Sequence, residues 1–337
     1  MLSTASIEIK HISAAVPKNC IQLDSFVGQW DWKYLERAKA LTGISKFHRA
    51  TGDLTGADLC VHATNLLFEK AQTSPAEIDA LIFVSSTFDY SQCPTGPSIA
   101  SQIGLKKQAI VIDLHSGCSG YVYGLLNAAL LLQSKGIKKC LLLNGETISK
   151  FLDPADSSTQ LIFSDAGTSS LIELSQNQER NSRFILGSNG NSSQIIFREE
   201  GGAKRTVDAD PYLRMNGMDI LGLSSKVVPD LISELLAAED LTIEEIDGFI
   251  FHQASLKILE LLSANLKLPK EKVHSTLAKY GNSGGPSLPI TLLDYKLKSN
   301  INAASKNTVL CAFGVGLSWG AVNLDCSQTI AYPMLFV

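Results

Sequence analysis

The sequence has no long hydrophobic run, no large excess of charge of one sign and no linker rich in proline, glycine and serine. Its longest apolar stretch, residues 121–133, contains Asn127 and is shorter than the roughly 18 residues of a candidate membrane helix. The formal net charge is -4, which gives no basic field for nucleic acid. We therefore expect no membrane span and no nucleic-acid partner.

The seven cysteines are an odd number, scattered without a CxxC pair or a Cys/His ligand spacing. This argues against a disulfide framework and against a structural zinc site. The first residues, MLSTASIEIKHISAAVP, lack the basic stretch and apolar core of a signal peptide. Together these absences predict a reduced, cytoplasmic enzyme with no metal.

With 45% hydrophobic residues, the chain can bury a large core. Helical patterns separate four apolar, β-rich runs, at residues 78–86, 138–146, 246–254 and 307–316. Continuous apolar strands between helices indicate a buried, parallel or mixed sheet and hence an α/β protein. The least hydrophobic region, residues 175–194, predicts exposed turns that join two halves.

The two halves repeat each other weakly. SPAEIDALIFVSS (74–86) matches TIEEIDGFIFHQA (242–254), and both predict a helix end followed by an apolar strand. Residues 161–174 and 310–324 each predict a strand, a tight glycine turn and a strand. The repeat favours duplication of one α/β unit, although any two βα units share some of this pattern.

Two residues that follow strand-like runs are candidate catalytic residues. Cys118 lies between glycines in SGCSGYVYGLL, where a strand-like run meets a helix-like run. A helix N-terminus capped by Ser119 would lower the thiol pKa and present N–H groups to an anion, but free cysteines are often simply buried. His252 ends an apolar strand in FIFHQAS, where open α/β sheets bind ligands, or it is a structural histidine.

Two glycine-rich segments follow. Asn282 lies in the loop KYGNSGGPSLP, and its amide could donate to a developing negative charge. The segment AFGVGLSWG (312–320) predicts a tight turn whose backbone N–H groups could complete an oxyanion hole. Each segment also fits an ordinary turn or hairpin, and the order of all four motifs is more specific than any one of them.

In this order the motifs resemble those of β-ketoacyl-acyl-carrier-protein synthase III, one of the thiolase-like condensing enzymes. LTGISKFHRA (41–50) is similar to the T-G-I-x-x-R segment of that family, and DPADSSTQLIFSDAG (153–167) is similar to its D-P-x-D-R and F-G-D-G-A-G stretch. The resemblance implies a thiolase-like α/β fold with two pseudo-twofold halves, residues 1–175 and 176–337, in five αβαβα layers.

The resemblance also implies roles for particular residues. Cys118 would accept an acyl group from an acyl-CoA or acyl-carrier-protein thioester. His252 and Asn282 would hold a malonyl thioester and stabilise its enolate, and the backbone N–H groups of Cys118 and Val315 would bind the oxyanion. It implies an acyl carrier protein as partner, a homodimer, and no cofactor or metal.

The sequence departs from the family pattern at several positions, among them the family's GNTS loop, which becomes GNSGG. Ser255 replaces the asparagine of HQAN, Ser157 replaces the arginine after D-P-x-D, and Ser164 replaces the first glycine of F-G-D-G. Val315 replaces a glycine, which requires either a negative φ or a reshaped turn. Since the usual Trp and Arg before T-G-I are also replaced, in the run YLERAKALTGI, we expect a primer other than acetyl-CoA, in lipid, polyketide or other specialised metabolism.

Further residues are candidates for binding the primer or its carrier. Lys257, Lys267 and Arg214 could form a basic patch for an acidic carrier protein, or they are ordinary solvated charges. Cys93, in a loop that shapes the acyl pocket in the family, takes the place of a bulky residue and could admit a longer or branched acyl group. His115 is expected to be a core histidine bonded to the backbone.

Cys311 precedes Ala312, the position at which a thiolase would carry a second reactive cysteine. A shift of one residue in a strand reverses the side chain, so we predict that Cys311 belongs to the core.

Two alternatives to condensation remain. One is an acyltransferase that moves the acyl group from Cys118 to an oxygen, nitrogen or sulfur nucleophile, and the other is a non-catalytic subunit of a heterodimer. The presence of both His252 and Asn282 favours condensation.

Overall fold

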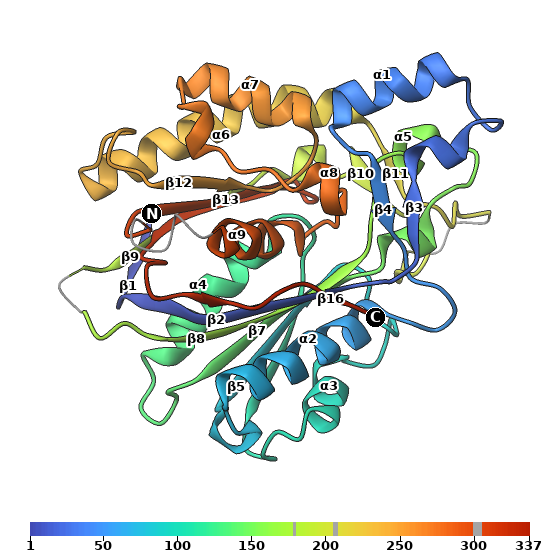
Figure 1. Ribbon diagram of the computed structural model, residues 1–337. Helices are drawn as coiled ribbons and strands as arrows, with labels where there is room; N and C mark the ends of the chain where they lie inside the picture. The colour runs from blue at the N-terminus through green and yellow to red at the C-terminus, as the bar shows by residue number, and fades with distance from the viewer. Residues whose placement is uncertain (178–179, 205–207, 299–304) are drawn as a thin grey trace.

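Two mixed β-sheets form the framework of the protein, with helices between them and on both outer faces (Figure 1). The computed structural model describes residues 1–177, 180–204, 208–298 and 305–337. The layers follow the order helix, sheet, helix, sheet, helix, so the predicted five-layered thiolase-like arrangement is confirmed.

The first sheet has seven strands in the order β15-β2-β8-β7-β5-β6, and β16 also pairs with β2. Its strands are β2 (Ile7–Val16), β5 (Ala80–Ser85), β6 (Ile110–His115), β7 (Cys140–Glu146), β8 (Ala166–Leu174), β15 (Ile330–Ala331) and β16 (Leu335–Phe336). Because β5 pairs in parallel with both β6 and β7, the carboxyl ends of these strands meet at one edge. The strands predicted at 78–86 and 138–146 are confirmed.

The second sheet has five strands in the order β1-β9-β14-β13-β12. They are β1 (Leu2–Thr4), β9 (Ser182–Ser188), β12 (Gly248–Phe251), β13 (Thr308–Gly314) and β14 (Ser318–Leu324). The strands predicted at 246–254 and 307–316 and the hairpin at 310–324 are confirmed. The chain ends cross between the halves, since β1 joins the second sheet while β15 and β16 join the first.

The helices fall into three layers (Figure 1). The middle layer holds α4 (Gly120–Leu132) and α9 (Ser287–Leu297). The first sheet is covered by α2 (Gly56–Ala71) and α3 (Gly96–Gln102). On the side of the second sheet lie α6 (Gly217–Glu239), α7 (Leu256–Leu266) and α1 (Trp32–Thr42). Side chains of α9 are buried from Ser287 to Lys296. A helix that is buried all round belongs between two sheets.

Short elements complete the described chain. They are the strand pairs β3 (Cys20–Gln22) with β4 (Lys46–His48) and β10 (Ile196–Phe197) with β11 (Arg214–Met215), the helices α5 (Ser157–Gln160) and α8 (Leu277–Tyr280), and 3-10 turns at Leu23–Phe26, Pro75–Glu77, Ile148–Phe151, Gly190–Ser192 and Lys270–Lys272. In the described ranges, no helix combines the length and apolar character needed to cross a bilayer.

Two predictions about connections were wrong. Residues 175–194 are not only exposed turns, because β9 runs through them between β1 and β14, with Phe184 and Ile185 buried; residues 178 and 179 lie outside the described part. Residues 161–174 do not form a hairpin but one strand, β8. Phe163 precedes that strand and bridges to Asn282 instead. In both places tertiary contacts decided the structure.

Candidate active site

Cys118 lies between β6 and α4, and its side chain is 6% exposed. Burial raises the pKa of the thiol to about 11; backbone hydrogen bonding by Val315 and by Cys118 itself opposes this, and the charge of Glu146 adds to it. The lowered pKa expected from the helix N-terminus was therefore wrong, because burial disfavours the thiolate more than the helix end favours it. The resting thiol is neutral.

The predicted capping role of Ser119 was also wrong. The residue occupies the N-cap position of α4 but makes no capping bond. Its hydroxyl instead pairs with the hydroxyl of Ser318 at 2.6 Å. Since Ser318 begins β14, this bond ties the start of α4 to the second half of the protein, next to Cys118.

The turn between β13 and β14 lies against the cysteine. A Cβ atom added at Gly314 would lie 2.7 Å from the Cys118 sulfur, so only glycine fits there. Gly314 and Gly316 have φ values of 154° and 132°, whereas the φ of Val315 between them is not positive. The two glycines take up the unusual backbone geometry, which lets a β-branched valine stand between them.

His252 follows the end of β12 and is 2% exposed. Burial lowers the pKa of its imidazole to about 4, although a backbone contact with Gly284 acts in the opposite direction. Its Nδ1 lies 2.7 Å from the Ser287 hydroxyl, which also accepts a hydrogen bond from the Gln253 N–H at 3.3 Å. A hydrogen bond from the Ser287 hydroxyl to Nδ1 would place the proton of the neutral imidazole on Nε2.

Asn282 lies in the loop between α8 and α9 and is 4% exposed. Its Oδ1 accepts the Gly284 N–H at 2.9 Å, which orients the amide so that Nδ2 can donate. The Ser164 N–H donates to the backbone carbonyl of Asn282 at 2.9 Å. The Ser164 hydroxyl donates to the His48 carbonyl at 2.9 Å and accepts the His48 N–H at 2.7 Å. Ser164 therefore joins β4 to the Asn282 loop.

The structure brings the three predicted side chains together. The ring of His252 lies edge-on to Phe313, with 5.7 Å between the centroids, and Phe313 directly precedes the glycine that contacts Cys118. Phe163, the bridge partner of Asn282, lines the same cavity as Cys118. Cys118, His252 and Asn282 are thus connected through Phe313, Gly314 and Phe163.

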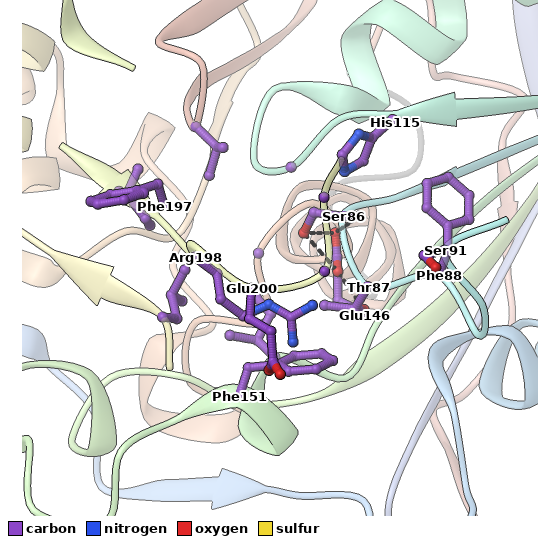
Figure 2. A pocket seen from close by; sticks show the side chains of 18 of the residues that line it. Ser86, Thr87, Phe88, Ser91, His115, Glu146, Phe151, Phe197, Arg198 and Glu200 are labelled. Carbon is purple, nitrogen blue, oxygen red and sulfur yellow. Dashed lines mark hydrogen bonds between the residues drawn. The ribbon is translucent and has the colours of Figure 1, made fainter. Parts of the chain in front are cut away.

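A cavity of about 690 Å³, which we call the Cys118 cavity, opens beside the thiol (Figure 2). Its walls come from the loop 86–94, the end of β6, the turn Ile148–Phe151 and parts of the segment 193–202. The side chains of His252 and Asn282 do not line it. Gly284, whose N–H donates to Asn282 Oδ1, does line the cavity, so the amide and the imidazole lie just behind that part of its wall.

Glu146 lies in this cavity, at the end of β7. Its carboxylate accepts hydrogen bonds from the Ser86 N–H at 2.8 Å, the Ser86 hydroxyl at 2.9 Å and the Thr87 hydroxyl at 2.7 Å (Figure 2). Burial raises the pKa of the carboxyl group to about 7 despite these donors. The contacts fix the start of the loop that forms one wall of the cavity.

The residues predicted to bind the primer or its carrier lie in different places. Ser255 caps α7, where its hydroxyl accepts the Ile258 N–H at 3.3 Å. Ser157 pairs with the Tyr34 hydroxyl at 2.8 Å, on the outer surface near α1. Lys257 and Lys267 are exposed but stand at opposite ends of α7, about 15 Å apart along the helix axis.

Arg214 differs from these lysines, because Asp153 contacts it at 2.8 Å and Asp210 contacts it as well. Its charge is thus used within the protein.

Cys93 is exposed at the rim of the Cys118 cavity. His115 was wrongly expected in the core: it is exposed at the end of the edge strand β6 and lines the cavity. Cys311 is fully buried, as predicted.

Three residues of the site were missed by the sequence analysis. Glu146 had a signal, a charged residue ending an apolar strand. Ser287 had none, because it stands 35 positions from His252 and only the fold brings them together. Arg198 lines the Cys118 cavity from a segment without a motif.

A buried cysteine beside a glycine-rich turn, with a histidine and an asparagine from the second half of a thiolase-like fold, defines a condensing enzyme. Comparison with known families agrees. Residues 112–190 match the family described as 3-Oxoacyl-[acyl-carrier-protein (ACP)] synthase III, and residues 236–326 match its C-terminal part. The chain belongs to the β-ketoacyl-acyl-carrier-protein synthase III family, a family of acyltransferase-type condensing enzymes.

Known relatives extend over almost the whole chain. The β-ketoacyl-acyl-carrier-protein synthase III of Streptococcus suis is 30% identical over 94% of this chain and 98% of its own length. The 3-oxoacyl-(acyl-carrier protein) synthase of Burkholderia xenovorans superposes with a TM-score of 0.95 at 30% identity, covering 100% of this chain and 98% of that one. The priming β-ketosynthase of the R1128 polyketide pathway has a TM-score of 0.85 at 23% identity, over 96% and 98% of the two chains, and shows the fold alone.

Proposed function

We propose that the protein transfers an acyl group to Cys118 and then joins it to a malonyl unit carried by an acyl carrier protein, with loss of carbon dioxide. The observation that carries this proposal is the 2.7 Å contact between His252 Nδ1 and the Ser287 hydroxyl. In the proposed arrangement the Ser287 hydroxyl donates to Nδ1, which leaves Nε2–H as a neutral donor in a buried site. Such a donor stabilises an enolate more than a ground-state carbonyl, because the charge exists only along the reaction path.

In the first step the sulfur of Cys118 attacks the carbonyl carbon of a thioester. The new bond forms as the carrier's thiol leaves and takes up the proton that the cysteine has lost. The backbone N–H groups of Cys118 and Val315 would bind the oxyanion, and the position of the Val315 turn against the sulfur supports this role. Since the resting thiol is neutral, the proton must leave as the bond to carbon forms.

In the second step the carbonyl of the malonyl thioester accepts hydrogen bonds from His252 Nε2 and Asn282 Nδ2. Carbon dioxide leaves, and its bonding electrons form the enolate. The enolate carbon attacks the acyl carbonyl, and the sulfur of Cys118 leaves and regains a proton. No other residue has to change its charge, which suits an imidazole whose pKa is lowered to about 4.

The primer, in this proposal, is not acetyl-CoA. The contact between Tyr34 and Ser157 supports this, because it closes the surface between α1 and α5 where the family holds the nucleotide. The cavity volume of about 690 Å³ also supports a larger acyl group, since sites of roughly 300–1,000 Å³ enclose whole small-molecule ligands. The exposed position of Cys93 at the rim leaves room for such a group.

An acyl carrier protein and a second copy of the chain are the proposed partners. Exposed Lys257 supports docking of an acidic carrier, whereas the acidic partners of Arg214 make that residue a weak candidate. The strand β6 is the last of its sheet, and Ile110 on it is 41% exposed. An unpaired edge of this kind supports pairing with the same strand of a second copy.

The test is incubation with labelled malonyl and acyl thioesters, followed by mass spectrometry of the protein and its products. The proposal predicts acylated Cys118, release of carbon dioxide and a β-keto product. Acyl-Cys118 that resolves only onto an added oxygen, nitrogen or sulfur nucleophile would show simple acyl transfer instead. Fast, saturable loading from acetyl-CoA would overturn the proposed choice of primer.

A further inference from the structure

Arg198 follows β10 and projects into the Cys118 cavity, where its guanidinium group lies over the ring of Phe151 (Figure 2). The guanidinium carbon is 4.0 Å from the ring centroid. This is a cation–π contact that holds the planar group by its face and leaves the N–H edge free to bind. The side chain is half-buried rather than spread over the surface.

The charge of Arg198 has no ionic partner among the described residues. The neighbouring Arg214, on the paired strand β11, is contacted by two aspartates instead. Gly201 leaves room for the guanidinium, since a Cβ atom there would lie 2.5 Å from Arg198 Nη2. An unpaired guanidinium held in a partly enclosed cavity is suited to bind a carboxylate with two parallel hydrogen bonds.

Three acidic side chains also line the cavity, but two of them are already used. Glu146 accepts from Ser86 and Thr87. Asp113 accepts the backbone N–H groups of Thr95 and Gly96 at 2.6 and 2.8 Å. The third, Glu200, is exposed, and its contacts include no ion pair to Arg198. The cavity therefore contains one guanidinium that no carboxylate of the described chain neutralises.

We propose that the Cys118 cavity accepts an acyl group whose far end carries a carboxylate, bound by Arg198. This inference rests on the proposed acylation of Cys118. The cavity contains the thiol but neither His252 nor Asn282, so the group that enters it is the primer rather than the malonyl unit. The chemical class is a dicarboxylic acid linked to its carrier through one thioester.

The test compares adipyl-pantetheine with hexanoyl-pantetheine, two thioesters that differ in the far end and contain no phosphate. Acylation of Cys118 is followed by mass spectrometry of the intact protein, without malonyl thioester. We expect the wild-type protein to react with the adipyl thioester about 10- to 100-fold faster at low concentration, as a charge-assisted pair requires. Arg198→Gln should remove this preference, and Arg198→Lys should retain part of it.

Two further variants separate binding from a general defect. Phe151→Leu removes the aromatic platform but keeps an apolar side chain, so the preference should fall by a few-fold only. Lys135→Gln removes one exposed positive charge outside the cavity and should leave the preference unchanged. Thermal unfolding of each variant checks that the fold is intact.

Four results would overturn the inference. The first is equal loading of both thioesters by the wild-type protein, and the second is an unchanged preference in Arg198→Gln. The third is an effect of that variant only when phosphopantetheine thioesters are used, which would place the phosphate on Arg198. The fourth is a loss confined to condensation, which would place the malonyl carboxylate there. If no thioester acylates Cys118, the proposed function fails as well.

Discussion

The groups proposed for condensation and the walls of the Cys118 cavity are built in different ways. His252 and Asn282 are almost fully buried, and the hydrogen bonds that orient them come from residues at the start of α9 or just before it. By contrast, the walls of the Cys118 cavity come largely from the loop 86–94 and the segment 193–202, with Arg198 half-buried among them. Regular elements fix the reacting groups, while connecting segments shape the space for the substrate.

The difference has a physical reason. Donors that stabilise an enolate must keep their position to within a fraction of an ångström, which packed helices and strands can enforce. A binding cavity can change with the sequence of its loops without disturbing the core. We therefore expect substitutions in the condensing groups and in the cavity walls to affect different steps of the reaction.

The largest separation is expected from His252→Ala. Loss of the Nε2 donor should slow condensation by about 100- to 1,000-fold, whereas acylation of Cys118 should change by less than about threefold, since the imidazole lies outside the cavity. Single-turnover mass spectrometry measures both steps. Asn282→Ala should behave in the same way. Equal losses in both steps would remove the proposed division between the condensing groups and the cavity walls.

The next effect concerns stability and pH. The pKa of His252 is about 4 in the folded protein and 6.5 without its surroundings, so the unfolded chain binds the proton more readily. The contribution of the buried neutral imidazole to the free energy of unfolding is complete above pH 6.5 and is lost as the pH falls toward 4. Between pH 7.5 and pH 4.5, urea unfolding should show the wild-type protein losing about 2 to 3 kcal/mol more than His252→Gln. Parallel losses would contradict the buried neutral imidazole.

A smaller effect is expected from Ser287→Ala, which removes the hydroxyl in contact with His252 Nδ1. Condensation should slow by about tenfold, the equivalent of one hydrogen bond to a reacting group, with acylation retained. NMR of the ¹⁵N-labelled imidazole should change from one tautomer to a mixture. Ser287→Thr, which keeps the hydroxyl, should restore part of the rate. An unchanged tautomer in Ser287→Ala would exclude this positioning role.

The smallest effect is expected from Ser164→Ala. This change leaves the backbone N–H of His48 without its partner, while the His48 carbonyl keeps the Asp165 N–H at 2.7 Å. The loss should lower the free energy of unfolding by about 1 to 2 kcal/mol. Condensation should change by less than about threefold, because the Ser164 N–H to the Asn282 carbonyl remains. Ser225→Ala, on the exposed face of α6, serves as the control and should be neutral.

Much of the fold could be predicted from local patterns. The apolar run ending at His252 behaved as expected, because β12 is buried along its whole length and a strand buried on both faces must be apolar throughout. The polar stretch 175–194 misled for the opposite reason, since β9 contains only two buried apolar residues, Phe184 and Ile185. The His115 prediction failed because an edge strand is exposed where its inner neighbours are not.

The sequence by itself determined the order of cysteine, histidine, asparagine and glycine turn, and with it the family and the α/β layers. Only the tertiary structure decided that burial raises the pKa of the Cys118 thiol, that Ser287 contacts His252 Nδ1 and that Arg198 has no ionic partner among the described residues. The reason is physical. A pKa, a tautomer and an unmatched charge depend on burial and on partners from distant parts of the chain, which no local pattern of residues records.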